Sequence, residues 1–194
     1  MDNLNTALIH DGKTFEGVVY TERAIRGREF QSSIFKKCDL SNMDLSHNKF
    51  LDCVFEDCNL SMIALDGSTL NDVAFVNCKM LGINFSKSLS FLFSVKFDGC
   101  ILDYSSFMGR KMLKTTFHKS SLKEVTFSQA ILTGSSFDGS NLEGAVFNRT
   151  DLSAVNFANA YNYSIEPEFN TIKNAIFSSQ GLAGLLSSYQ IKIV

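Results

Sequence analysis

Apolar residues recur at every fifth position over most of this 194-residue chain. Stepping by five from Phe15 to Phe85 gives fifteen apolar residues in succession, and stepping from Leu92 to Phe157 gives fourteen more. Because 45% of the chain is apolar, such a run would arise by chance on the order of once in 10¹⁰ trials. Neither an α-helix nor a β-strand repeats its side-chain direction every five residues. The five-residue unit therefore constrains the fold more than any single helix or strand.

A period of five is accommodated if each unit forms one side of a four-sided coil, with its central residue pointing inward. The residue two positions earlier then also points inward, near a corner where only small side chains have room. It is Ala, Ser, Thr, Cys or Val in 21 of the 29 units. The sequence therefore predicts an all-β fold, a parallel β-helix with four sides and about twenty residues per coil.

Phenylalanine marks one side of the predicted coil at every turn. The spacing is twenty residues, except for one step of twenty-two between Phe75 and Phe97. We expect these rings to form a stacked core ladder in about eight coils, a rod of roughly 40 Å. The extra two residues predict a bulge within residues 86–91 and not a domain boundary. The expected ladder consists of Phe15, Phe35, Phe55, Phe75, Phe97, Phe117, Phe137, Phe157 and Phe177.

The cysteines follow the same register, since all five occupy the small inward position. Stacked coils place such side chains about 4.8 Å apart, which is too far for an ordinary disulfide, and a straight row cannot surround a tetrahedral metal ion. We expect reduced thiols that fill the core. The residues concerned are Cys38, Cys53, Cys58, Cys78 and Cys100.

The two ends depart from the repeat, as terminal repeats of a solenoid usually do. The pattern divides the chain into an N-terminal cap at residues 1–12, the β-helix at 13–177 and a tail at 178–194. Large cations occupy small inward positions in the first coil, which predicts that this coil is distorted. They are Lys13, Arg23 and Arg28.

Apolar residues in the tail recur first at helical and then at strand spacing. The tail is therefore expected to be a short helix followed by a strand. It can cap the rod, and it can also join two rods into a homodimer, because an apolar end face suits an identical partner. The candidate interface is Leu182, Leu185, Leu186, Tyr189, Ile191 and Ile193.

No residue pattern indicates catalysis. The three histidines lie far apart in the register, and no nucleophile, metal-binding or nucleotide-binding motif occurs. We therefore expect no enzyme activity, no catalytic residue, no cofactor and no metal. Arg110 stands at a small inward position. We expect a local kink to turn it outward, and the alternative is a recognition feature.

The balance of 18 basic and 20 acidic residues gives a net charge of −2, which argues against direct nucleic-acid binding. No apolar stretch is long enough to span a membrane, so we expect a cytoplasmic protein. The charges are unevenly distributed, however. An acidic belt comprises Asp39, Asp44, Asp52, Glu56, Asp57, Asp66 and Asp72, and a basic belt comprises Arg110, Lys111, Lys114, Lys119 and Lys123.

The units CDLSN, FEDCNLS, SNLEGAVF and TDLSAVNF resemble the A(D/N)LXX signature of the pentapeptide repeat family, over roughly residues 13–177. This resemblance implies a right-handed quadrilateral β-helix. The stretch KKCDLSNMDLSHNKFLDCVFEDCNLS and the ending LLSSYQIKIV resemble the Qnr-type quinolone-resistance proteins. That resemblance implies a DNA-mimicking dimer, joined by a C-terminal helix, that binds DNA gyrase and topoisomerase IV and protects them from fluoroquinolones.

Two hypotheses for function follow. The first is a non-enzymatic DNA mimic that binds a type II topoisomerase through the acidic belt. The second is a scaffold of the same family that presents flat β-faces to an unidentified protein, for example in stress response or toxin immunity. The basic belt favours the second, because it would repel the positively charged DNA-binding surface of a topoisomerase.

Overall fold

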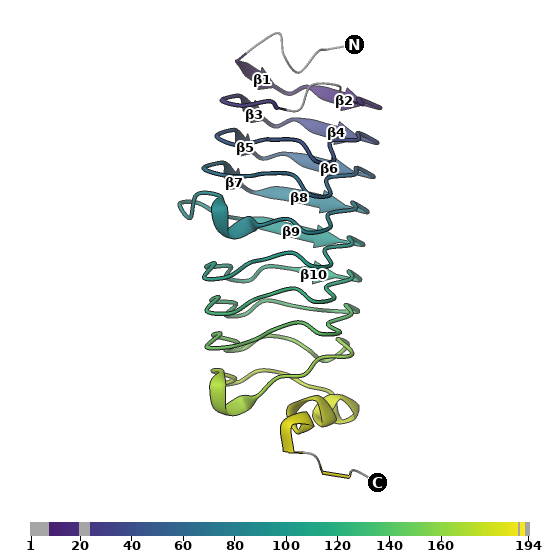
Figure 1. The fold of residues 1–194 in the computed structure, drawn as a ribbon, viewed down its shortest axis with the longest axis vertical. Coiled ribbons are helices and arrows are strands. Elements are labelled where there is room, and N and C mark those ends of the chain that lie inside the picture. The colour runs from purple at the N-terminus through teal and green to yellow at the C-terminus, as the bar shows by residue number, and fades with distance from the viewer. Residues whose placement is uncertain (1–7, 20–23, 190, 193–194) are drawn as a thin grey trace.

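The computed structural model describes residues 8–19, 24–189 and 191–192. The chain forms a right-handed parallel β-helix, with coils stacked one on another between the two termini (Figure 1). The family resemblance implied this fold, and the structure confirms it.

Two parallel sheets form two sides of the rod. One has the order β1-β3-β5-β7 and the other the order β10-β9-β8-β6-β4-β2. The strands are β1 (Ile9–Asp11), β2 (Thr14–Glu16), β3 (Glu29–Gln31), β4 (Ile34–Lys36), β5 (Lys49–Leu51), β6 (Val54–Glu56), β7 (Thr69–Asn71), β8 (Val73–Val76), β9 (Val95–Asp98) and β10 (Phe117–His118). The larger sheet covers about five turns, fewer than the eight coils expected. Isolated parallel bridges such as Ser136↔Asn156 and Asn156↔Ile176 continue the stacking beyond it.

Most corners of the coil carry a residue with a left-handed backbone. Asp52 (φ 52°), Asp57 (φ 55°) and Lys114 (φ 54°) occupy such corners, as do many glycines. Asn, Asp and Gly adopt this conformation at the lowest cost. Backbone hydrogen bonds then join each coil to the next, for example from Ser32 N–H to Leu51 O at 2.9 Å. Five residues per side therefore turn the chain and still satisfy its backbone.

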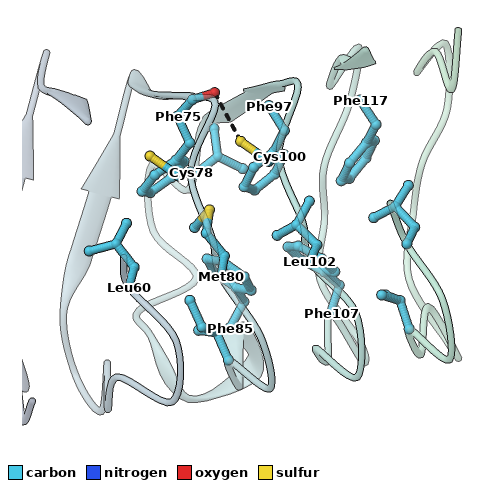
Figure 2. Packing of buried hydrophobic residues seen from close by; sticks show 14 of the residues in the cluster. Leu60, Phe75, Cys78, Met80, Phe85, Phe97, Cys100, Leu102, Phe107 and Phe117 are labelled. Carbon is cyan, nitrogen blue, oxygen red and sulfur yellow. Dashed lines mark hydrogen bonds between the residues drawn. The ribbon is translucent and has the colours of Figure 1, made fainter. Parts of the chain in front are cut away.

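Stacked phenylalanine rings fill the centre of the rod (Figure 2). The Phe55 and Phe75 rings lie 5.2 Å apart at 16°, and every neighbouring pair from Phe15 to Phe177 is stacked in the same way. A second column meets the first edge-on, with the Phe117 and Phe127 rings 5.6 Å apart at 83°. These are the two favourable geometries for aromatic pairs, so the rings pack the core and also fix the register of the coils.

The five cysteines are buried and free. Their thiols donate to carbonyl groups of the preceding coil, as Cys100 Sγ does to Phe75 O at 3.4 Å (Figure 2). Cys38, Cys58, Cys78 and Cys100 follow one another in a single corner column, because each lies three residues after a ring of the Phe15 to Phe177 column. The thiols therefore act as small core side chains.

The first coil is regular where the structure describes it, contrary to the expected distortion. Strand β1 pairs in register with β3, and β2 with β4. Lys13 is exposed and Arg28 only partly buried. Lys13 lies in the first coil, where its side chain can lean outward. Arg23 lies outside the described residues.

The C-terminal region carries short 3₁₀-helices. They are η2 (Pro167–Phe169), η3 (Ser179–Leu185) and η4 (Ser187–Tyr189), and a further one, η1 (Phe85–Lys87), lies in the middle of the rod. The expected helical tail is therefore present as two 3₁₀ segments. The expected strand is wrong for Ile191, which is exposed and in no regular element, and Ile193 lies outside the described residues.

Candidate functional site

One side of the rod carries a loop at residues 88–94, which we call the bulge loop. The twenty-residue spacing still holds at Leu89, whose N–H donates to Ser68 O with the same offset as Lys49 N–H to Arg28 O, and it has become twenty-two at Val95, which pairs with Val73. The two extra residues therefore lie between these points. In Figure 1 this segment, just after η1, projects beside the stacked coils.

The bulge loop exposes apolar side chains. Phe91 is 76% exposed, Leu92 55% and Leu89 48%, while Phe93 turns inward and meets the Phe85 ring edge-on at 6.4 Å. Sequence analysis placed Leu92 among the inward residues, which is wrong, and it did not identify Leu89 or Phe91 as surface features. The signal was present, since Phe91 to Phe93 are three apolar residues in succession, which the five-residue register does not require.

Arg110 lies beneath the bulge loop and is only 2% exposed, so the expectation that it turns outward is wrong. Its Nε donates to Phe85 O at 2.8 Å, one terminal nitrogen donates to Ser90 Oγ at 3.0 Å, and the other donates to Ser88 O. The guanidinium carbon lies 5.0 Å from the centre of the Phe93 ring. Burial lowers the pKa of Arg110. The two inserted residues carry the loop outward, and the side chain fills the corner beneath them.

Arg110 also replaces a missing contact between coils. The corner carbonyl of Ser68 accepts from Leu89 N–H of the next coil, and that of Ala130 accepts from Asp151 N–H in the same way. The equivalent carbonyl of Ser88 accepts instead from the Arg110 guanidinium. Arg110 therefore braces the loop where the backbone ladder is interrupted.

The acidic belt is less charged than the sequence suggests. Asp44 is paired with Arg26, Glu56 with Lys36 at 2.9 Å, and Asp72 with Lys96 at 3.0 Å. A hydrogen bond from Arg26 holds the pKa of Asp44 below its ordinary value. These bases lie outside residues 39–72, so a count along the sequence misses them. The belt acids that form no ion pair with a described residue are Asp39, Asp52, Asp57 and Asp66.

The basic belt is also smaller than expected. Arg110 is buried, and Lys123 is paired with Glu143 at 2.8 Å. Lys111, Lys114 and Lys119 remain exposed and pair with no acid among the described residues. The basic belt therefore presents three exposed lysines that are not neutralised by a described acid.

The tail packs over the last coil through two glycines. A methyl group on Gly181 would lie 2.0 Å from Tyr163 Oη, and one on Gly184 would lie 2.3 Å from Tyr163 O. Leu185 packs against the core. The other candidate interface residues that the structure describes are exposed: Leu182, Leu186, Tyr189 and Ile191.

The described residues contain no group of three or more His, Cys, Asp or Glu side chains that could hold a metal ion. The three histidines lie far from one another. His10 is buried against Phe30, and His47 is exposed at a corner. The Nδ1 atom of His118 lies 3.1 Å from Oδ2 of Asp138. Across the same residues, no helix is long and apolar enough to cross a membrane.

Comparison with known proteins gives the family. The model of the pentapeptide repeat region matches residues 28–91 and 90–157. Comparison with curated proteins gives no significant match. Two trypsin-treated variants of QnrB1, a plasmid-mediated fluoroquinolone resistance protein, share the fold at 17% and 16% identity. Their TM-scores are 0.59 and 0.57, and they cover 96% and 97% of this chain and 100% of their own.

HetL, a pentapeptide repeat protein involved in heterocyst differentiation regulation from Nostoc sp. strain PCC 7120, is as similar in fold. It has 13% identity and a TM-score of 0.59, with 89% of this chain and 88% of HetL covered. The family match extends over more than half of the sequence and agrees with the observed coils. This chain belongs to the pentapeptide repeat family.

Proposed function

We propose that this protein is a non-enzymatic rod that binds a type II topoisomerase, DNA gyrase or topoisomerase IV, in place of DNA and protects it from fluoroquinolones. The observation that carries the proposal is the group of four free acids, Asp39, Asp52, Asp57 and Asp66, on the outside of the rod. Residues 39–72 span about 1.7 coils, or roughly 8 Å of rod, over which duplex DNA carries about five charges. The local charge density is therefore close to that of DNA.

The rod holds these charges at a fixed spacing. Stacked rings and ladders of hydrogen bonds between coils leave little freedom to the corners that carry Asp52 and Asp57. A rigid binding surface loses less entropy on association than a flexible one. The likeness in fold to QnrB1 supports the same role.

We also propose that the tail joins two rods. Leu182, Leu186, Tyr189 and Ile191 are exposed at the C-terminal end of the coil stack, where a second copy would cover them. An isologous contact of this kind would double the length of the DNA-like rod.

A gyrase supercoiling assay with ciprofloxacin tests the topoisomerase proposal. Micromolar protein should restore supercoiling in the presence of the drug, and the D52N/D57N/D66N variant should restore much less. Asn tolerates the left-handed corners of Asp52 and Asp57, so the variant should fold normally. The matched control E16Q/D98N/E124Q removes three exposed acids outside the belt and should act as wild type. Absence of binding and protection by wild type would reject the proposal.

A second candidate is a scaffold for a different protein. The exposed Lys111, Lys114 and Lys119 favour it, because they would face the basic DNA-binding surface of a topoisomerase with like charge. Affinity capture from the native host separates the two. Recovery of another protein without topoisomerase subunits would support the scaffold, and recovery of gyrase or topoisomerase IV would support the first proposal.

A further inference from the structure

The side of the rod that carries the bulge loop changes the sign of its charge across the loop. The two coils before the loop carry Asp52 and Asp72 on this side, and the coil after it carries Lys111 and Lys114. Lys49, also before the loop, is paired with Glu29 at 3.1 Å. The side is therefore acidic on one flank of an exposed apolar loop and basic on the other.

Asp72 and Lys114 occupy equivalent positions on this side. Asp72 follows the inward Leu70 by two residues, and Lys114 follows the inward Met112 by two residues. Both have a left-handed backbone, with φ of 50° and 54°. Leu70 precedes Phe75 by five residues, and Met112 precedes Phe117 by five, while Phe97 stacks between these two rings. Asp72 thus lies one coil before the loop and Lys114 one coil after it.

We propose that a second copy of this chain docks antiparallel on this side, about a two-fold axis that crosses the bulge loop. This rotation reverses the direction of the rod and keeps the position across the side. Asp72 of each copy then lies opposite Lys114 of the other, and Phe91 and Leu92 of both copies meet at the centre. Asp52, one coil beyond Asp72, and Lys111, in the same coil as Lys114, add to the charge of their flanks without lying directly opposite each other.

A second copy fits this side better than an unrelated partner with a single sign of charge. An acidic partner would complement Lys111 and Lys114 and would meet Asp52 and Asp72 with like charge, and a basic partner would do the reverse. A two-fold contact brings the same patch of both subunits together, so a patch with two opposite halves complements itself.

The loop is already in place for such a contact. Arg110 fixes Ser88 and Ser90, so Phe91 is held outward before association, and exposed aromatic side chains commonly dominate the energy of an interface. The ion pair between Asp72 and Lys96 joins two side chains that are both more than half exposed. Such a surface pair contributes little, so it can be exchanged for a contact across the interface.

Sedimentation velocity of four full-length chains separates this contact from the proposed tail dimer. The chains are wild type, F91S/L92S, the tail variant L186D/I191D, and the combination of both. If both contacts form, wild type gives assemblies larger than a dimer, each single variant gives dimers and the combination is monomeric. If only the loop contact forms, the tail variant stays dimeric and F91S/L92S is monomeric.

The loop contact is measured in the tail variant, where F91S/L92S should raise the dimer dissociation constant at least about 30-fold. The control M62S/Y104S removes two exposed apolar residues from a different side of the rod, both with a left-handed backbone like that of Leu92, and it should leave the constant unchanged. A tail variant that stays monomeric up to about 100 µM, which corresponds to no more than a weak contact, would overturn the proposal.

Charge exchange tests the antiparallel arrangement itself, again in the tail variant. K111E/K114E and D52K/D72K should each be monomeric, because each makes both flanks alike in charge. Lys is accepted at these corners, since Lys114 and Lys119 already have φ of 54° and 46°. An equimolar mixture should restore a heterodimer, since both flanks are then complementary. Dimers of either variant alone, or no association on mixing, would overturn the arrangement.

Discussion

The Nε of Arg110 donates a hydrogen bond of 2.8 Å to the carbonyl oxygen of Phe85, which lies in the coil before it. The residues at equivalent corners do the same with smaller side chains, as Ser68 Oγ does to Leu45 O at 2.7 Å and Thr150 Oγ1 to Phe127 O at 3.0 Å. An arginine keeps this bond and also reaches the two serines of the bulge loop. The solenoid thereby accepts two extra residues without losing its register.

Replacement of Arg110 by alanine should release the bulge loop while the coils remain. Ala130 occupies the same corner one coil later, so the backbone accepts alanine there. The Ser88 carbonyl would lose its donor, and an unsatisfied buried acceptor costs about 1–3 kcal/mol. Urea denaturation should show this loss of stability, and hydrogen exchange should be faster at the amides of Leu89 and Ser94, which donate to the preceding coil.

The nearby Met108→Ala is the control for this variant. Met108 is exposed on a different side of the rod, so its replacement should change stability by less than about 0.5 kcal/mol and leave exchange in the loop unchanged. Unaltered loop exchange in R110A would show that Arg110 does not brace the loop.

Truncation of a ring in the ladder should destabilise the whole rod. Phe117 is fully buried and stacks between Phe97 at 5.1 Å and Phe137 at 4.8 Å. Phe117→Ala should lower the free energy of unfolding by about 3–5 kcal/mol, because it removes buried apolar area and leaves a cavity. Phe169→Ala, at a ring that is 58% exposed, should cost less than about 1 kcal/mol in the same urea titration. Equal losses in the two variants would contradict the stacked core.

The repeat made the core predictable, but it could not predict the surface. Phe117 could be placed inward from the sequence alone, because a five-residue period leaves it no other direction. Arg110 could not, because the same rule reserves its position for small side chains and says nothing of the space that an insertion creates one coil earlier. Its direction depends on the loop geometry, which the period does not encode.

The charge of the acidic belt was overestimated for a related reason. Residues 18 to 24 apart in sequence become neighbours in adjacent coils, so Asp44 meets Arg26 and Asp72 meets Lys96. A count of charges over residues 39–72 therefore misses bases that lie outside this range in the sequence but beside it on the rod. In the tail, the alternation of Ile191 and Ile193 predicted a strand, but Ile191 has no strand beside it with which to pair among the described residues.

The thiols should be inert in the folded protein. Burial raises the pKa of Cys53, and a hydrogen bond with Cys100 together with burial raises the pKa of Cys78 to about 12. The same hydrogen bond lowers the pKa of Cys100, but this side chain is only 1% exposed, so a reagent cannot reach it in the folded protein. Only the thiolate reacts with a disulfide reagent. At pH 8 the native protein should therefore react with Ellman's reagent only as fast as it unfolds, and denaturant should release five thiols.

A variant with one exposed cysteine, Q31C, provides the positive control for this measurement. Gln31 points outward from β3, so its replacement should add one rapidly reacting thiol. Rapid reaction of wild type, or fewer than five thiols after denaturation, would contradict buried and reduced cysteines.

The two tail glycines should be needed for docking of η3. A Cβ on Gly181 would overlap the hydroxyl of Tyr163 and one on Gly184 would overlap its backbone carbonyl, and Tyr163 is itself buried. G181A and G184A should detach the tail, so that limited proteolysis cuts near residue 180 while the rod stays intact. Ala183→Ser changes an exposed neighbour and should not increase cleavage. Wild-type resistance in both glycine variants would show that the tail is held by other contacts.

Acid should destabilise the protein partly through Asp44. The hydrogen bond from Arg26 keeps the pKa of Asp44 below its ordinary value of 3.8. A carboxyl with a lowered pKa in the folded state contributes stability above its unfolded pKa, and this contribution disappears as the pH falls toward the folded value. Wild type should therefore lose stability as the pH falls from about 5 to 2, and D44N should lose less, because an amide does not titrate. Urea midpoints measured across this range give the change of stability with pH for each variant.

The control for this prediction is D66N. Asp66 lies on the same side of the rod as Asp44 and forms no ion pair with a described residue, so D66N should keep the wild-type dependence of stability on pH. A D44N slope equal to that of wild type would show that the pair with Arg26 does not stabilise the fold.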